Sequence, residues 1–240
     1  MKISSVLVPV SVALLAGTSA PAVAQSALGT FEGAELSYRF TKTSEDYGYN
    51  QFMSGVGINF GNLTTQFDLG TGGYDGEFGD PSTWTLHVGY MVSPNTEVGA
   101  FYGQETWVGG SSDPYQYYGL EGMYATGAFE VEAALGTYLD NNSSDIYYQF
   151  LTVDGAYAFN QNWSALGHLT LTSNSEYYED FVIIGAGARY ETGTGMYAQA
   201  SYHSMRGEYD NNILEFKVGY EFGNGVTYSN RGWNDVLVTY

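Results

Sequence analysis

The sequence predicts an all-β protein whose antiparallel strands close into a transmembrane up-and-down barrel of about twelve strands. Three features favour this fold class: apolar and polar residues alternate along the chain, short links alternate with long ones, and no segment after the N-terminus is apolar enough to cross a membrane as a helix. The stretch "LEFKVGYEF" (214–222) shows the alternation, with an apolar side chain at every second position. Successive side chains of an extended chain point to opposite faces, so this stretch is predicted to be a two-faced strand.

The N-terminus is typical of a secretory signal peptide. A lysine at position 2 precedes a largely apolar run over residues 6–16 and the small residues "AVA" at 22–24. The run is too short to anchor the chain in a bilayer as a helix, so cleavage is expected before Gln25. The expected divisions of the chain are a signal peptide at 1–24, a barrel at 25–222 and a C-terminal tail or closing segment at 223–240.

Composition excludes several classes of protein. The chain has 32 Gly, 23 Tyr and no Cys, so neither a disulfide scaffold nor a Cys-based zinc site can form. The 26 Asp and Glu residues outnumber the 7 Lys and Arg residues, and the formal net charge is -19. This charge disfavours nucleic acid as a partner, because phosphate binding needs the opposite sign. No EF-hand or nucleotide-binding spacing occurs, and we expect no cofactor and no metal site.

The expected strands follow one another along the chain, and no helical periodicity of comparable strength interrupts them. Each has apolar residues at alternate positions over a length that suits a tilted membrane strand. Every proline lies in the signal peptide or in a link, as expected if each strand is paired on both sides. The apolar positions fall within residues 34–40, 52–60, 63–69, 84–92, 98–102, 118–124, 129–135, 147–159, 163–171, 182–190, 196–202 and 214–222.

The links between these strands alternate in length. Short links such as "GN", "SPNT" and "ETGTG" separate longer polar links such as "TKTSEDYGY" and "GTGGYDGEFGDPS". A membrane barrel has short periplasmic turns and longer outer loops, whereas a soluble sandwich gives no reason for this alternation. Large aromatic residues on the apolar side flank the short turns or the far end of the chain, as in a girdle at one membrane interface, so the apolar side is expected to face lipid. These residues are Phe60, Tyr90, Tyr124, Phe129, Phe159, Trp163, Tyr190 and Phe222.

The hexapeptide "KVGYEF" (217–222) resembles the closing-strand signal of Gram-negative outer-membrane β-barrel proteins, in which a polar residue, a Gly and a terminal aromatic are read by the barrel assembly machinery. The resemblance implies a location in the cell outer membrane, with lipid, lipopolysaccharide and that machinery as partners, and a homo-oligomer would fit the trimers usual among porins. The chain departs from the pattern because it continues with "GNGVTYSNRGWNDVLVTY". This tail either lies in the periplasm or the barrel entrance, or forms the true last strand at "DVLVTY" (235–240).

The polar side of each strand is expected to line the lumen. Acids gather on the fifth to eighth strands, and the cations lie on the first, tenth and twelfth, an arrangement that resembles the charge separation with which porins orient polar solutes. The predicted pore-lining residues are Arg39, Asp68, Glu105, Glu121, Glu130, Glu132, Asp154, Arg189, Glu215 and Lys217. With Glu35 and Glu221, acids outnumber cations, which predicts cation preference unless the charges pair and fill the interior. Lumen-facing glycines favour an opening; they include Gly99, Gly103, Gly119, Gly185, Gly187 and Gly219.

The expected function is porin-like ion and solute transport, the passive diffusion of small polar or cationic solutes. The alternative is a non-conducting structural or adhesive barrel that binds through acidic, Tyr-rich outer loops such as "SSDPYQYY" and "SNSEYYED". An enzyme is a third class, because some outer-membrane barrels cleave acyl chains with Ser and His on the lipid-facing surface. His87, His168 and His203 all fall on the lumen side by strand parity, so we expect no catalytic residue.

Overall fold

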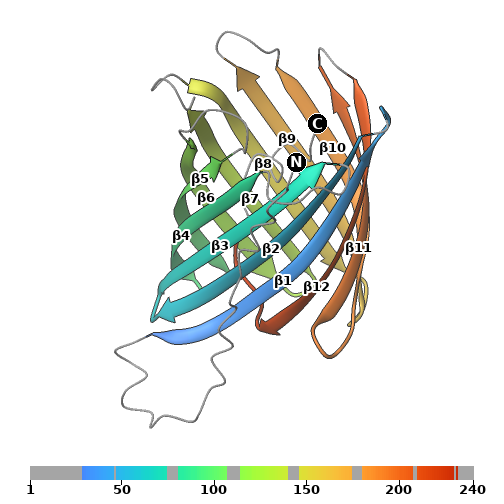
Figure 1. The fold of residues 1–240 in the computed structure, drawn as a ribbon. Helices are drawn as coiled ribbons and strands as arrows, with labels where there is room; N and C mark the ends of the chain where they lie inside the picture. Colours follow the sequence, from blue (N-terminus) through green and yellow to red (C-terminus); the bar gives the residue numbers. More distant parts are fainter. Residues whose placement is uncertain are drawn as a thin grey trace, which may run out of the picture.

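The computed structural model describes residues 29–45, 47–74, 81–106, 114–139, 146–174, 180–207, 210–229 and 231. Twelve antiparallel strands form one closed barrel in chain order, and β1 pairs with β12 (Figure 1). The predicted all-β up-and-down barrel is confirmed. The strands are β1 (Thr30–Thr43), β2 (Gly48–Phe60), β3 (Leu63–Tyr74), β4 (Ser82–Ser93), β5 (Thr96–Thr106), β6 (Tyr115–Thr126), β7 (Phe129–Leu139), β8 (Ile146–Ala158), β9 (Trp163–Asn174), β10 (Phe181–Glu191), β11 (Met196–Arg206) and β12 (Asn211–Gly223).

The barrel closes through the strand that carries the hexapeptide "KVGYEF". Its register with β1 runs from Gly33 opposite Gly223 to Thr43 opposite Ile213. The start of β1 and the end of β12 therefore lie at the same end of the barrel as the short turns, and the longer links lie at the other end (Figure 1). No helix long and apolar enough to cross a membrane occurs among the described residues. The predicted signal peptide and the stretch "DVLVTY" lie outside those residues.

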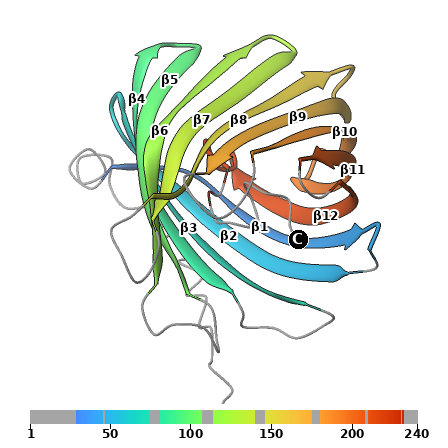
Figure 2. The same cartoon turned by 90° about the horizontal axis from the view of Figure 1, so that it is seen from above.

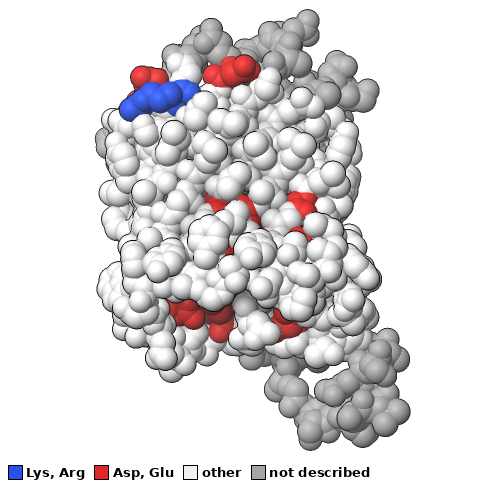
Figure 3. All heavy atoms as spheres, turned by 180° about the vertical axis from the view of Figure 1, so that it is seen from behind, with Lys and Arg blue, Asp and Glu red and all other residues white. Residues whose placement is uncertain are grey.

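The outer wall of the barrel is apolar. Leu120, Ile184 and Val218 are at least half exposed, although each lies near the middle of its strand. Figure 3 shows this wall from behind as a largely uncharged surface, with charged side chains at the upper rim and small red areas at mid-height and toward the lower end. All eight aromatic residues of the predicted girdle are exposed on this surface as well. Because exposed apolar surface of this extent is unfavourable in water, the wall is suited to lipid.

Part of the barrel interior is filled by aromatic side chains. One buried cluster projects inward from β5 to β8 and consists of Phe101, Tyr117, Ala134, Tyr138, Tyr148 and Phe150. The rings of Tyr117, Tyr138 and Tyr148 are stacked in succession, with centroids 5.1 and 4.9 Å apart. This cluster occupies one side of the lumen, whose ring of strands is seen from above in Figure 2.

Several lumen-facing glycines accommodate these rings. A Cβ at Gly119 would lie 2.6 Å from the Phe101 ring, and one at Gly219 would lie 2.6 Å from the Tyr197 ring. The ring of Tyr117 covers Gly103 in the same way. The expectation that these glycines leave an opening is therefore wrong at these positions, because neighbouring aromatic side chains occupy the space that a missing side chain provides.

Candidate functional site in the barrel lumen

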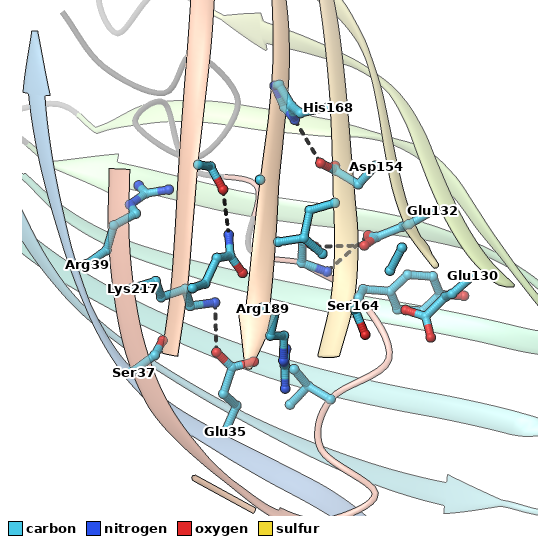
Figure 4. Close-up of a pocket in the computed structure, with 18 of the residues that line it drawn as sticks. Glu35, Ser37, Arg39, Glu130, Glu132, Asp154, Ser164, His168, Arg189 and Lys217 are labelled. Atoms are coloured by element: carbon cyan, nitrogen blue, oxygen red, sulfur yellow. Dashed lines mark hydrogen bonds and ion pairs between the residues drawn. The ribbon is translucent and has the colours of Figure 1, made fainter. Parts of the chain in front are cut away.

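A polar cavity of about 460 Å³ lies inside the barrel. Its lining comes mainly from β7 to β12 and from β1 to β3, together with chain that follows β12 (Figure 4). The aromatic cluster described above contributes none of the lining residues. The lumen is thus divided into a side that is packed with rings and a side that is hollow and charged.

Most of the predicted pore-lining residues meet at this cavity. Eight of them line it: Arg39, Asp68, Glu130, Glu132, Asp154, Arg189, Glu215 and Lys217. Glu105 and Glu121 point inward and are buried, but they do not line the cavity. Glu105 accepts a hydrogen bond of 2.9 Å from the Tyr138 hydroxyl, so it belongs to the aromatic side of the lumen. A role in conduction stays a prediction for all ten residues.

The three predicted cations each contact an acid on their own side of the lumen. Arg39 lies 3.7 Å from Glu215, across the pairing of β1 with β12. The Lys217 ammonium lies 2.8 Å from Glu35, and Figure 4 shows this pair at the cavity wall. Arg189 of β10 lies 2.5 Å from Glu221. The cations therefore do not form an uncompensated positive wall, because carboxylates accompany each of them.

A second group of charges lies on the opposite wall, around His87 of β4. Its Nδ1 atom is 2.9 Å from Glu121, and its Nε2 atom is 3.1 Å from Asp68. His87 is fully buried, and both carboxylates are almost fully buried. Carboxylates this close in a water-poor region repel one another unless cationic groups lie between them. The imidazole of His87 lies between Asp68 and Glu121 and contacts both carboxylates, so it reduces their repulsion.

The fourth cation that lines the cavity, Arg231, comes from the chain after β12. Arg231 contacts both Glu121, at 3.4 Å, and Glu132, and the Arg231 side chain is only 2% exposed. Residues 224–229 and 231 belong to no strand; we call them the lumenal segment. They begin at the short-turn end of the barrel and pass into the lumen, where most of them line the cavity. Residues 224–229 and 231 therefore enter the lumen from the barrel entrance and do not lie in the periplasm, whereas the alternative of a last strand at 235–240 falls outside the described residues and stays a prediction.

Two of the residues that hold the lumenal segment, Gln66 and Glu97, were not among the predicted pore-lining residues. Both bind Tyr228, but neither stands out in sequence from the other polar residues of its alternating strand. Arg231 carried one detectable signal, because it is one of only 7 Lys and Arg residues and the only one in the sequence that follows the closing strand. An acid-rich lumen needs cations to compensate its carboxylates.

All three histidines lie on the lumen side, as their parity indicates. His168 Nδ1 is 2.7 Å from Asp154, and its Nε2 atom is 3.0 Å from the Thr170 hydroxyl. His203 lies beside it, with ring centroids 5.3 Å apart, and both of its ring nitrogens lack a hydrogen-bond partner among the described residues. None of these rings reaches the lipid-facing wall. A Ser and His pair on that wall, as expected for acyl-chain cleavage, is therefore not available.

Comparison with solved structures identifies the type of barrel. The chain is similar to a KdgM porin, with a TM-score of 0.56 and 12% identity over 78% of this chain and 98% of that one. The COG4313 outer membrane channel from Pseudomonas putida F1 has a TM-score of 0.57 and 14% identity, over 80% of this chain and 96% of that one. The chain has the fold of outer-membrane porins. With the apolar outer wall, this porin-like fold indicates the outer membrane.

The same fold also occurs in an enzyme. The outer membrane phospholipase A from Escherichia coli has a TM-score of 0.54 and 12% identity, over 78% of this chain and 89% of that one. No family model and no curated protein matches the sequence of this porin-like barrel. These likenesses show the fold alone, so a channel role and the absence of catalysis both stay predictions. Of the Tyr-rich stretches of the adhesive alternative, "SSDPYQYY" contributes residues 115–118 to β6, and residues 175–179 of "SNSEYYED" lie outside the described residues.

Proposed function

We propose that the protein is a diffusion channel of the outer membrane for small polar solutes, with a preference for cations. The observation that carries this proposal is the charge of the lumenal cavity. Eight carboxylates line it, against four Arg or Lys side chains. Charged side chains along a pore select the ions that pass, so an excess of carboxylates favours cations and disfavours anions.

The size of the cavity supports small solutes. Its volume of about 460 Å³ lies within the range of sites that hold small molecules. One solved structure of the KdgM porin holds oligogalacturonate, a polymer that carries many carboxylates. A lumen with an excess of carboxylates would repel such a polyanion, so a neutral or cationic solute suits this chain better.

The test is single-channel recording in a planar bilayer with a salt gradient across it. Residues 25–240 and residues 25–222 are both measured, because the lumenal segment occupies part of the lumen. We expect discrete conductance steps in at least one form, with a reversal potential on the cation-selective side. Glu130→Gln should lower this selectivity, because Glu130 lines the cavity near the short turns. Glu45→Gln removes the same charge from an exposed link outside the cavity and should leave selectivity unchanged.

Two results would contradict the proposal. A barrel that inserts but stays silent in both forms is not a channel. A conducting barrel that prefers anions, or that keeps its selectivity in the Glu130→Gln variant, does not use the cavity acids to select ions.

A further inference from the structure

The lumenal segment is held by side chains of five consecutive strands. It leaves β12 through Gly223 and Gly225, whose φ angles of 66° and 78° are rarely adopted by other residues. Asn224 then donates a backbone hydrogen bond of 3.1 Å to the Glu32 carbonyl of β1. From there the segment crosses to the opposite wall and contacts β3 to β7. The wall side chains that receive it are Gln66, His87, Glu97, Glu121 and Glu132.

Gln66 recognises the backbone of the segment. Its amide oxygen accepts a hydrogen bond of 2.9 Å from the Tyr228 N–H, and its amide nitrogen donates one of 2.6 Å to the Tyr228 carbonyl. This pair of bonds is the contact that an adjacent strand would make with an extended peptide. Gln66 is 1% exposed, so its amide is fully committed to the segment and to Asp68.

The side chain of Tyr228 fits a prepared position on this wall. Its ring stacks on His87, with centroids 5.6 Å apart and planes 8° from parallel. Its hydroxyl donates a hydrogen bond of 2.9 Å to Glu97. Gly89 and Gly99 leave room for this hydroxyl, because a Cβ at either position would lie 2.7 or 3.0 Å from it. The position thus selects an aromatic ring with a polar end.

Two acids hold the far end of the segment. Glu132 accepts hydrogen bonds from the Ser229 N–H at 3.0 Å and from the Ser229 hydroxyl at 2.7 Å, and it also contacts the Arg231 guanidinium. Glu121 contacts the same guanidinium. Ion pairs and hydrogen bonds to charged groups are the strongest of these contacts.

We propose that Gln66, His87, Glu97, Glu121 and Glu132 form a peptide-binding site in the lumen, which the lumenal segment occupies as a tethered plug. The ligand class is a short cationic peptide with an aromatic residue three positions before an Arg. This inference rests on the proposed channel function, since the plug restricts flow only if the barrel conducts. The plug is releasable, because the twelve-strand closure is complete without it and the segment makes no strand pairing.

The first experiment compares single channels of residues 25–240 and residues 25–222. The truncated chain keeps the pairing of β1 with β12 up to Phe222. We expect its open fraction to be roughly tenfold higher or more, because the plug is held by several contacts that act together. A synthetic peptide with the sequence of residues 224–231, "NGVTYSNR", should then block the truncated channel. The peptide must be added at roughly millimolar concentration, because the tether gives the segment in the complete chain an effective concentration of that order.

Variants test the individual contacts. A peptide with Gln in place of its Arg should block at least about tenfold more weakly, since the group that pairs with two buried carboxylates is lost. In the complete chain, Arg231→Gln and Tyr228→Ala should each raise the open fraction, which keeps the test valid if the truncated chain does not fold. Arg206→Gln removes a cation from an exposed pair near the rim and is the matched control.

The possible outcomes separate the two proposals. Equal conduction by both chain forms, with no block by the peptide, would overturn the plug and leave the channel standing. Silence of both forms would overturn the channel. In that case, calorimetric titration of the peptide into folded residues 25–222 still decides the site: binding that depends on the Arg supports it, and absence of binding refutes it.

Discussion

Glycines in this barrel differ in how closely other atoms approach the position of a missing Cβ. Gly119 faces the lumen, where a Cβ would lie 2.6 Å from the Phe101 ring and 2.7 Å from the Cα atom of Gly136. Gly167 of β9 has no atom within 4 Å of the same position. The first glycine is required by the packing of a ring against backbone, whereas the second is not.

This difference predicts opposite effects of adding one methyl group. Gly119→Ala should lower the free energy of unfolding by about 1–3 kcal/mol, because the surrounding backbone and ring must move. Gly167→Ala should be neutral or slightly stabilising, since Ala costs less backbone entropy than Gly in a strand. Urea titration of the refolded barrel, followed by Trp fluorescence, measures both. Equal effects of the two substitutions would refute the packing role of Gly119.

At the scale of the single strand, alternate side chains point to the outer wall and to the lumen. In β6, Leu120 is 65% exposed on the outer wall, whereas its neighbour Glu121 is 6% exposed inside. A shift of one residue in register would exchange these environments along the whole strand. The register between β6 and its neighbours is therefore determined by the bilayer as much as by hydrogen bonds.

A cation on the outer wall should be costly according to its depth. Leu120→Lys places an ammonium near the middle of a membrane-spanning strand and should cost about 2–4 kcal/mol of folding free energy. Asn95→Lys, in the short link between β4 and β5, places the same group at the membrane interface and should cost about 0–1 kcal/mol. The measurement is urea unfolding in lipid vesicles. A similar loss in both variants would argue against a lipid-facing wall at Leu120.

At the scale of the whole molecule, the lumen is asymmetric because two kinds of filling meet in it. The aromatic cluster packs one side of the lumen, and the paired charges of β1, β10 and β12 line the cavity on the other side. The lumenal segment links them, because it brings Arg231 to the wall that carries Glu121 and Glu132. The acids of this wall thus obtain their cation from a segment far away in sequence.

A double-mutant cycle measures this link. Arg231→Gln and Glu132→Gln should each lower the free energy of unfolding by about 1–3 kcal/mol, because each leaves a buried partner unsatisfied. The double variant should lose clearly less than the sum, with a coupling of roughly 0.5–3 kcal/mol. Additive losses would show that the two side chains do not stabilise the fold as a pair.

The control cycle uses an exposed pair at the rim. Arg206 lies 3.9 Å from Asp210, and the two side chains are 54% and 66% exposed. Arg206→Gln and Asp210→Asn should couple by less than about 1 kcal/mol, because water screens exposed ion pairs. A coupling as large as that of Arg231 with Glu132 would indicate that burial does not strengthen the lumenal pair.

Much of the fold was predictable from particular residues. Leu120 and Glu121 could be assigned to opposite faces, because parity depends only on the extended chain. The same rule brought Glu132, Asp154 and Lys217 to the cavity. It could not indicate which residues pair, since the contact of Lys217 with Glu35 depends on the register between β12 and β1.

The closed all-β barrel and its two faces could be predicted from the residues alone, because alternation, link length and the lack of a membrane-spanning helix are local properties of the chain. The contents of the lumen could be known only from the folded barrel. The rings that cover Gly103 and Gly119 come from neighbouring strands, and the cation between Glu121 and Glu132 comes from a segment with no periodic pattern. Such contacts depend on where distant parts of the chain meet in space, which strand periodicity does not encode.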